Sequence, residues 1–438
     1  MKLSLGFSFL SLVVQSPEPQ SIKWNARVNP HFEEIEALLP DFQYIESDDD
    51  RIVLTVGFTA TFYFWNGHTP KIREALVKCF EAFEVAFGSH LKWGFDADKA
   101  RWIKLSEGTM PSLRTYIKPL DEDDCIEWYV TSSNDKEAVG EYVASCLTER
   151  GWMDGECSSF RFQVPRSLVF ESDGNKSLLN LISLCNEQLT PFHGNAGLTA
   201  ISPRDEIDWE AEKFDLATRY NALYIDDRVT DEISAPRGIK GVNWLTFISN
   251  TLSECLGGPA SFVNYCRRFG IEPIPSGAGF LIQAGEYPQL GPIESPAPEE
   301  YVKANAALRP LRNGNFGSMG TGSINGELRF DRCTSDLWIR RFDVPGTWPP
   351  KTLIGLPRVP LGAAPRKKIN LKTGEVCTIH GRYREFGFVT PPDYGDDEDI
   401  APMVVLLPGD AAPYLLKLGS HGEFLGRDIV KWELVAEL

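Results

Sequence analysis

The sequence lacks the compact motifs by which many enzymes and metal proteins are recognised. No two cysteines form a CxxC pair, and no GxSxG sequence marks a nucleophilic serine. Only six of the 438 residues are histidines, which limits the bases available to activate a serine or cysteine nucleophile. No run of about 18 apolar residues is present, so we predict no membrane-spanning helix.

Positive charge is also scarce. The chain carries 61 acidic and 44 basic side chains, a formal net charge of −17. Broad binding of nucleic acid or anionic lipid requires clustered Lys and Arg, so we expect neither as a direct partner. Residues 366–438 hold 12 acidic and 9 basic side chains, a net of −3, which leaves −14 on residues 1–365. A basic protein partner is electrostatically favoured.

The nine cysteines are scattered along the chain, and several lie in apolar helical stretches such as KIREALVKCFEAF. This pattern indicates free buried thiols in a reducing compartment rather than a disulfide framework. The first residues, MKLSLGFSFLSLVVQSPEP, resemble a signal peptide only weakly, because Lys2 is the single charge and no small-x-small cleavage site follows. We therefore expect a cytoplasmic protein.

Strand and helix patterns are mixed along the chain. Residues 51–65 are rich in β-branched and aromatic side chains and predict one long strand or two short ones. The turn NGHTP follows, with Thr69 as the expected N-cap of a helix and Pro70 at its first position. Further patterns predict a helix over residues 135–151 and a closing strand over residues 336–343.

These patterns predict an α+β fold of two related halves, each with mainly antiparallel sheet and helices packed on it, plus a small β-rich C-terminal appendage. The appendage, at about 70 residues, is small for an independent core and is expected to dock on the main body. The expected divisions are an N-terminal extension at 1–50, a first half at 51–205, a second half at 206–345, a proline-rich linker at 346–365 and the appendage at 366–438.

Candidate reactive groups are few. The glycine-rich residues 313–326 lack the GKS or GKT ending of a phosphate loop and predict a surface loop. Cys377 and His380 have the spacing of half a zinc site, but no second half follows. His68 and His193 lie in turn-like sequences. We predict no cofactor and no metal ion, and the enzymatic alternative is a hydrolase-like site that pairs one of these two histidines with a carboxylate.

Carboxylates occur in three short runs. None has the alternating oxygen pattern of a calcium-binding EF-hand, and like charges at close spacing favour solvated loops. Such loops are also suited to face a basic surface on a protein partner. The candidate partner-contacting residues are Asp396, Asp397, Glu398 and Asp399, followed by Asp48, Asp49, Asp50, Asp121, Glu122, Asp123 and Asp124.

Several longer stretches carry a family resemblance. VNWLTFISNTLSECLGG (242–258), with GFLIQAGEYPQLG and LWIRRFD after it, resembles the bacterial type VI secretion immunity proteins for VRR-Nuc-type nuclease effectors. TATFYFWNGHTPKIREALVKCFEAF and HGNAGLTAIS (193–202) are similar to the same family, and the resemblance spans about residues 52–343. Family members commonly carry AGPxPxxGD where this chain reads AGEYPQLGPI.

The resemblance implies a non-enzymatic inhibitor that binds a cognate toxin, a VRR-Nuc-type nuclease, and protects the producing cell and its kin. Because a nuclease cleft is lined with basic groups that contact phosphate, an acidic inhibitor is suited to fill it and occlude the active site. Aromatic side chains at the centre of such an interface would supply most of the affinity. A further alternative is immunity to another class of toxin, such as a periplasmic or membrane-acting one.

Overall fold

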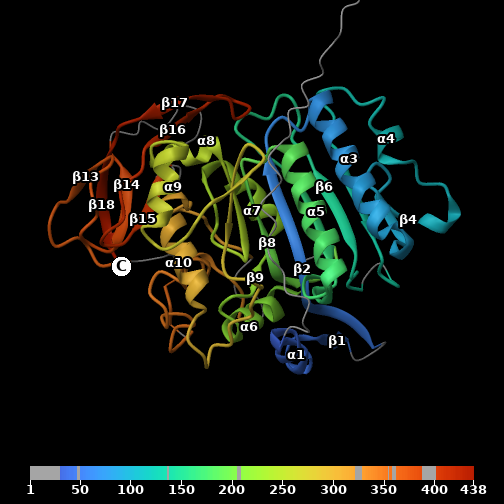
Figure 1. Ribbon diagram of the computed structural model, residues 1–438, viewed down its shortest axis with the longest axis horizontal. Helices are drawn as coiled ribbons and strands as arrows, with labels where there is room; N and C mark the ends of the chain where they lie inside the picture. Colours follow the sequence, from blue (N-terminus) through green and yellow to red (C-terminus); the bar gives the residue numbers. More distant parts are fainter. Residues whose placement is uncertain are drawn as a thin grey trace, which may run out of the picture.

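The computed structural model describes residues 30–46, 50–135, 138–204, 209–320, 328–353, 355–357, 362–386 and 401–438. These residues form a large twisted sheet with helices on its faces and a smaller β unit at one side (Figure 1). Mixed helices and antiparallel sheets confirm the predicted α+β class. In the described part of the chain, no helix is long and apolar enough to cross a membrane.

The large sheet is antiparallel except for one short parallel pair between β8 and β9. Its main path, from edge to edge, is β11 (Ile274–Ser276), β12 (Gly279–Gln283), β10 (Leu245–Ser249), β8 (His193–Ile201), β2 (Arg51–Phe64), β7 (Ser158–Val164), β6 (Val143–Leu147), β5 (Glu127–Thr131), β3 (Trp93–Asp96) and β4 (Arg101–Lys104). Two short strands lie off this path: β1 (Tyr44–Glu46) pairs with β2, and β9 (Tyr224–Ile225) pairs with β8.

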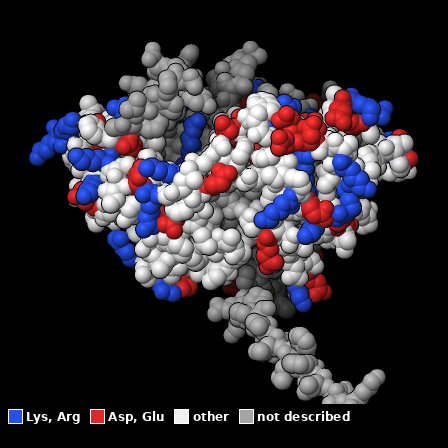
Figure 2. All heavy atoms as spheres, turned by 90° about the horizontal axis from the view of Figure 1, so that it is seen from above, with Lys and Arg blue, Asp and Glu red and all other residues white. Residues whose placement is uncertain are grey.

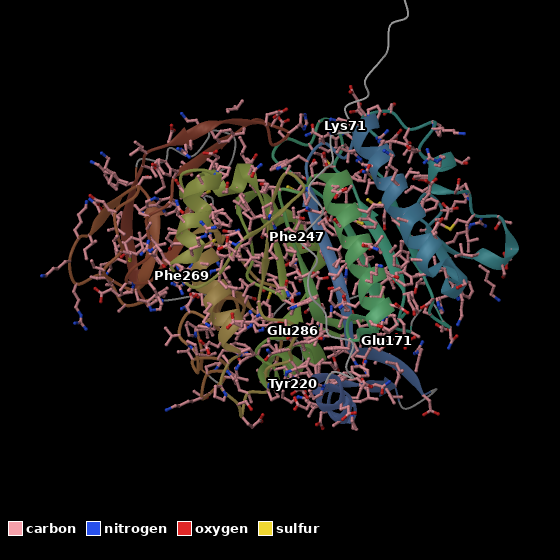
Figure 3. The ribbon with its side chains drawn as sticks, viewed as in Figure 1. Lys71, Glu171, Tyr220, Phe247, Phe269 and Glu286 are labelled. Carbon is pink, nitrogen blue, oxygen red and sulfur yellow. The ribbon has the colours of Figure 1, made fainter. Side chains whose placement is uncertain are left out.

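The helices surround this sheet. They are α1 (Pro30–Ala37), α2 (Leu39–Phe42), α3 (Pro70–Phe87), α4 (Leu113–Tyr116), α5 (Ser172–Leu189), α6 (Glu210–Arg219), α7 (Arg228–Ser234), α8 (Asn250–Ser253), α9 (Pro259–Arg267), α10 (Glu299–Leu308) and α11 (Arg332–Ile339). Figure 3 labels Lys71, near the start of α3, at the upper end of the molecule and Glu171, just before α5, at the lower end. The two helices therefore run in opposite directions across the same face of the sheet (Figure 1).

The central strand β2 shows how the sequence positions this layer. Phe58 and Phe62 lie in the apolar core with α3 and α5, while Thr59 and Thr61 alternate with them and face the other side of the sheet. The helix α3 begins as predicted, because the Thr69 side chain accepts a hydrogen bond from a backbone N–H of its first turn. The strand composition and the cap are both local signals, and the predicted strand and the predicted N-cap are confirmed.

Two predicted elements are wrong. Residues 135–151 were expected to be helical, but β6 lies there between β5 and β7. Ala144 and Cys146 enter the core while Ser145 lies on the opposite face, so strand pairing on both sides overrides the weak helical pattern. Residues 336–343 were expected to form a strand, but α11 extends into them, because Asp331 and Thr334 form a capping box that starts this helix.

The two predicted halves share one sheet, since β8 pairs with β2 on one side and with β10 on the other. A first core lies between this sheet and α3 and α5. A second core lies toward its lower end and includes Phe42, Phe214, Trp338 and Trp348. The divisions of the chain at residues 205 and 345 remain predictions.

The C-terminal unit is β-rich, as expected. Its strands are β13 (Asn370–Lys372), β14 (Gly381–Glu385), β15 (Met403–Leu406), β16 (Leu415–Leu418), β17 (Phe424–Asp428) and β18 (Lys431–Glu437). Buried ion pairs join it to the body: Arg309 lies 2.8 Å from Asp410, and Arg382 lies 2.7 Å from Asp336. These contacts dock the unit firmly on the body.

Candidate functional site

Three loops meet at the upper end of the large sheet in Figure 1. Phe64, the last residue of β2, is paired with Ser158, the first residue of β7. Leu147, at the end of β6, is paired with Glu127, at the start of β5. This antiparallel register places the turn after β2 beside residues 118–126 and 148–157. We call residues 118–126 and 148–157 together the acidic loop pair.

A buried arginine holds the first of these loops. Arg73 of α3 is 4% exposed, and its guanidinium donates hydrogen bonds to the backbone carbonyls of Leu120 (3.0 Å), Asp121 (2.6 Å) and Asp124 (2.7 Å). The side chains also close the loop, since Asp124 accepts from the N–H of Asp121 and Asp121 accepts from the N–H of Asp123. The loop is therefore built with a defined backbone.

The second loop, residues 148–157, is hydrogen-bonded to the first, residues 118–126. The N–H of Gly151 donates to the carbonyl of Glu122 at 2.7 Å, so the two backbones are directly joined. The next residue, Trp152, is 63% exposed, and the guanidinium carbon of Arg150 lies 5.9 Å from the centre of its ring. Farther along, the N–H of Gly155 donates to the carbonyl of Ser420 in the C-terminal hairpin. The backbone is thus held by hydrogen bonds on both sides of Trp152.

Exposed carboxylates surround this tryptophan. Across the acidic loop pair, six acidic and two basic side chains are exposed, a local net charge of −4. Figure 2 looks onto the upper end of the molecule and shows red carboxylates gathered on the side of α3 and α4. The six acidic residues are Asp121, Glu122, Asp123, Asp124, Asp154 and Glu156, and the two basic residues are Lys118 and Arg150.

The structure describes one of the three predicted carboxylate runs in full, residues 121–124, and a single residue of a second, Asp50. Asp50 is exposed just before β2, at the end of the sheet opposite to the acidic loop pair. Asp48, Asp49 and the run Asp396, Asp397, Glu398 and Asp399 lie outside the described residues. Of the predicted partner-contacting residues, only Asp121, Glu122, Asp123 and Asp124 are seen as a group on one surface of the described chain.

His68 does meet a carboxylate. Its Nδ1 lies 3.3 Å from Oε1 of Glu149, which also accepts from the N–H of Gly67 at 2.5 Å. Burial raises the pKa of Glu149 to about 7 and lowers the pKa of His68 below its ordinary value. The ring of His421, from the C-terminal hairpin, lies 4.7 Å from that of His68. These groups join the hairpin to the upper end of the sheet.

In the part of the chain that the structure describes, neither candidate histidine has the partners of a nucleophile-activating base. Within the described ranges, the hydrogen bond of the His193 ring is to the carbonyl of Ala235, at 2.9 Å, and burial lowers its pKa to about 4. No hydroxyl or thiol in these ranges bonds to His68 or His193. The half zinc site is also incomplete, because the described residues hold no group of three or more potential metal ligands. The Cys377 thiol instead contacts the carbonyl of Ile379.

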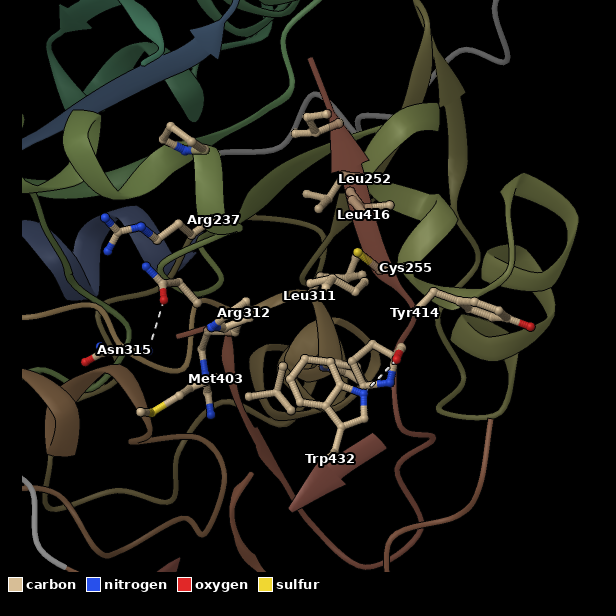
Figure 4. A pocket seen from close by; sticks show the side chains of 18 of the residues that line it. Arg237, Leu252, Cys255, Leu311, Arg312, Asn315, Met403, Tyr414, Leu416 and Trp432 are labelled. Carbon is tan, nitrogen blue, oxygen red and sulfur yellow. Dashed lines mark hydrogen bonds between the residues drawn. The ribbon is translucent and has the colours of Figure 1, made fainter. Parts of the chain in front are cut away.

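A cavity of about 280 Å³ lies between the body and the C-terminal unit (Figure 4). Its labelled lining is largely apolar, and Trp432 donates its indole N–H to the carbonyl of Pro413. The described residues that line the cavity include Arg237 and Arg312 but no Asp, Glu or His. The principal lining residues are Leu252, Cys255, Leu311, Met403, Tyr414, Leu416 and Trp432.

Sequence reasoning missed Trp152, Arg73 and Glu149. The segment RGWMDGEC carries a turn signal in its Asp-Gly pair, which would have placed Trp152 in a surface turn. No local signal identifies Arg73, because it lies within a regular helix and its partners are about fifty residues farther along the chain.

The described part of the chain thus combines an α+β body with an acidic surface whose two loops are held by backbone hydrogen bonds. Residues 75–342, more than half of the chain, match the family TsiV, described as type VI immunity for VRR-NUC. The chain therefore belongs to this family of type VI secretion immunity proteins, and the resemblance read from the sequence is confirmed.

A solved structure agrees with this assignment. The chain is similar to the Pseudomonas aeruginosa T6SS protein PA0821, with 27% identity and a TM-score of 0.63. The likeness covers 72% of this chain and 91% of that one. No curated protein sequence matches the chain.

Proposed function

We propose that this protein binds a VRR-Nuc-type nuclease effector of the type VI secretion system and occludes its active site. It acts in the cytoplasm by binding alone, without catalysis or a cofactor, and so protects the producing cell and its kin. The observation that carries this proposal is membership of the immunity family over residues 75–342. Nucleic acid and membrane are not direct partners in this account.

The charge of the chain supports the same mechanism. A nuclease must bind phosphate, so its cleft carries Lys and Arg side chains that an acidic protein can pair with. This chain carries −17 overall, and −14 of that lies before residue 366. Attraction of this kind speeds encounter and excludes acidic competitors, while apolar contacts provide most of the affinity.

Co-expression tests the proposal directly. The effector encoded beside this protein's gene is induced in a sensitive host, with and without this protein. We expect growth and intact chromosomal DNA only when the protein is present, and no protection against an unrelated nuclease toxin. Death of the host despite abundant folded protein would contradict the proposal.

A further inference from the structure

We propose that the acidic loop pair is the surface on which the nuclease effector docks, with Trp152 as its apolar anchor. This inference rests on the proposed function and adds the contact surface to it. The occupant is a phosphate-binding cleft, that is, Lys and Arg side chains around an apolar depression that accepts the indole ring. Trp152 inserts into this depression, and the surrounding carboxylates pair with the basic rim.

The exposure of Trp152 is the first support. An indole ring is a large apolar group, and folded proteins generally bury it. Among the tryptophans that the structure describes, Trp152 alone is exposed, at 63%, whereas Trp244 and Trp338 are fully buried. Tryptophan is also the residue type most enriched at the energetic centres of protein interfaces. An exposed indole within a charged rim is a group that a protein partner can cover.

The second support is the rigidity of the surface. Three hydrogen bonds from Arg73 fix one loop, and the contacts of Gly151 and Gly155 fix the other. The approach at Gly151 is close, since a Cβ there would lie 3.2 Å from the carbonyl oxygen of Glu122. A surface that is ordered before binding loses little conformational entropy on association, so its contacts contribute more fully to affinity.

Two unpartnered polar atoms are buried beneath this surface. Nε of Arg73 and Oε2 of Glu149 have no hydrogen-bond partner among the described residues, although both side chains are less than 5% exposed. Unpartnered buried atoms of this kind destabilise a fold. Both belong to the groups that hold the acidic loop pair or lie against it.

Charge decides which kind of partner fits. The local net charge of −4 repels nucleic acid and anionic lipid. It also disfavours a symmetric contact with a second copy of this chain, in which the same acidic patch would face itself. A basic protein surface is the complementary occupant. Four carboxylates of the acidic loop pair accept no hydrogen bond within the described chain and are therefore available to such a surface. They belong to Glu122, Asp123, Asp154 and Glu156.

The test is the binding of the full-length protein to a catalytically inactive form of the neighbouring effector. Trp152→Ala should weaken binding about 30-fold or more, as expected for a central interface anchor. Val85→Ala is the matched control, because Val85 is an exposed apolar residue on α3, at 90% exposure, and should bind like the wild type. Unfolding midpoints of both variants verify that each is folded.

A second variant tests the charges. Neutralising Glu122, Asp123, Asp154 and Glu156 should slow association about tenfold at about 0.1 M salt and by less than about twofold at about 1 M, where the Debye length is about 3 Å. The control neutralises four exposed acids away from the acidic loop pair and should leave the association rate unchanged. These four are Glu33, Glu171, Asp173 and Glu294.

The outcomes separate this inference from the proposed function. If the wild-type protein neither binds nor inhibits the effector, the proposed function fails. If the wild type inhibits it but Trp152→Ala and the quadruple variant bind as tightly and as fast as the wild type, the function stands and the acidic loop pair is not the docking surface.

Discussion

Replacing Arg73 with methionine should loosen the acidic loop pair while leaving the surrounding helix intact. Arg73 donates to three carbonyls, those of Leu120, Asp121 and Asp124, at 2.6 to 3.0 Å. Each hydrogen bond from a charged donor contributes about 1.5–3 kcal/mol, so a simple sum gives about 4.5–9 kcal/mol. Two effects reduce this sum. Water can reach the exposed loop and replace some of the lost bonds, and the variant no longer buries a guanidinium.

We therefore expect Arg73→Met to lower the free energy of unfolding by about 2–4 kcal/mol. Burial lowers the pKa of Arg73, because desolvation penalises its charge, and the same penalty offsets part of the gain from its bonds. Equilibrium unfolding in urea measures the change, and Arg73→Lys is the matched control. Lysine retains the charge but lacks the planar guanidinium, so we expect a smaller loss, between the wild type and the methionine variant.

The same variant should bind the effector more weakly although Arg73 is buried and touches no partner. Hydrogen exchange at residues 120–124 should become faster in Arg73→Met, while exchange in β2 stays slow. A loss of stability below about 1 kcal/mol, with unchanged exchange in this loop, would refute the reasoning that Arg73 holds it in place.

Three further predictions concern contacts within the body and between it and the C-terminal unit. Because the pKa of Glu149 is raised to about 7, the folded state is favoured while this carboxyl is protonated; the stability that it contributes is complete below about pH 4.5 and is lost as the pH rises through 7. When the free energy of unfolding is measured from pH 4.5 to 8, Glu149→Gln should remove this loss, which is up to about 3 kcal/mol. Arg309→Met should lower the free energy of unfolding by about 3–5 kcal/mol, because it leaves Asp410 buried without its ion pair. Adding Asp410→Asn to this variant should recover part of the lost stability in the same assay. Gly155→Ala should cost about 1–2 kcal/mol in thermal unfolding, because its φ of 76° is unfavourable for a side chain.

Each of these three predictions has an outcome that would contradict it. A wild-type stability profile parallel to that of Glu149→Gln across this pH range would show that the buried carboxyl does not titrate near 7. An Arg309→Met variant as stable as the wild type would show that the ion pair does not hold the C-terminal unit. An unchanged melting temperature for Gly155→Ala would show that the turn tolerates a side chain.

Secondary structure could be predicted from the sequence where the signals that set it are local. The cap at Thr69 lies next to the helix that it starts, and the β-branched and aromatic residues of β2 lie within that strand, so both elements were predicted correctly. Local pattern was insufficient for β6, because its strand pairing with β5 and β7 is decided by distant segments. At α11 the capping residues lie outside the segment that suggested a strand.

The site was predicted in outline only. A run of four acids indicates an exposed loop, and residues 121–124 are exposed. That this loop has a defined backbone depends on Arg73, and that it borders an exposed tryptophan depends on the contact between Gly151 and Glu122. Both contacts join residues far apart in the chain, so no pattern within either segment could reveal them.

The central claim is inhibition by direct binding. The most direct measurement is DNA cleavage by the purified neighbouring effector, titrated with this protein. The account predicts that cleavage falls in proportion to the protein added and ends near one protein per effector, while an unrelated nuclease remains active. Undiminished cleavage at a saturating excess of folded protein would contradict it.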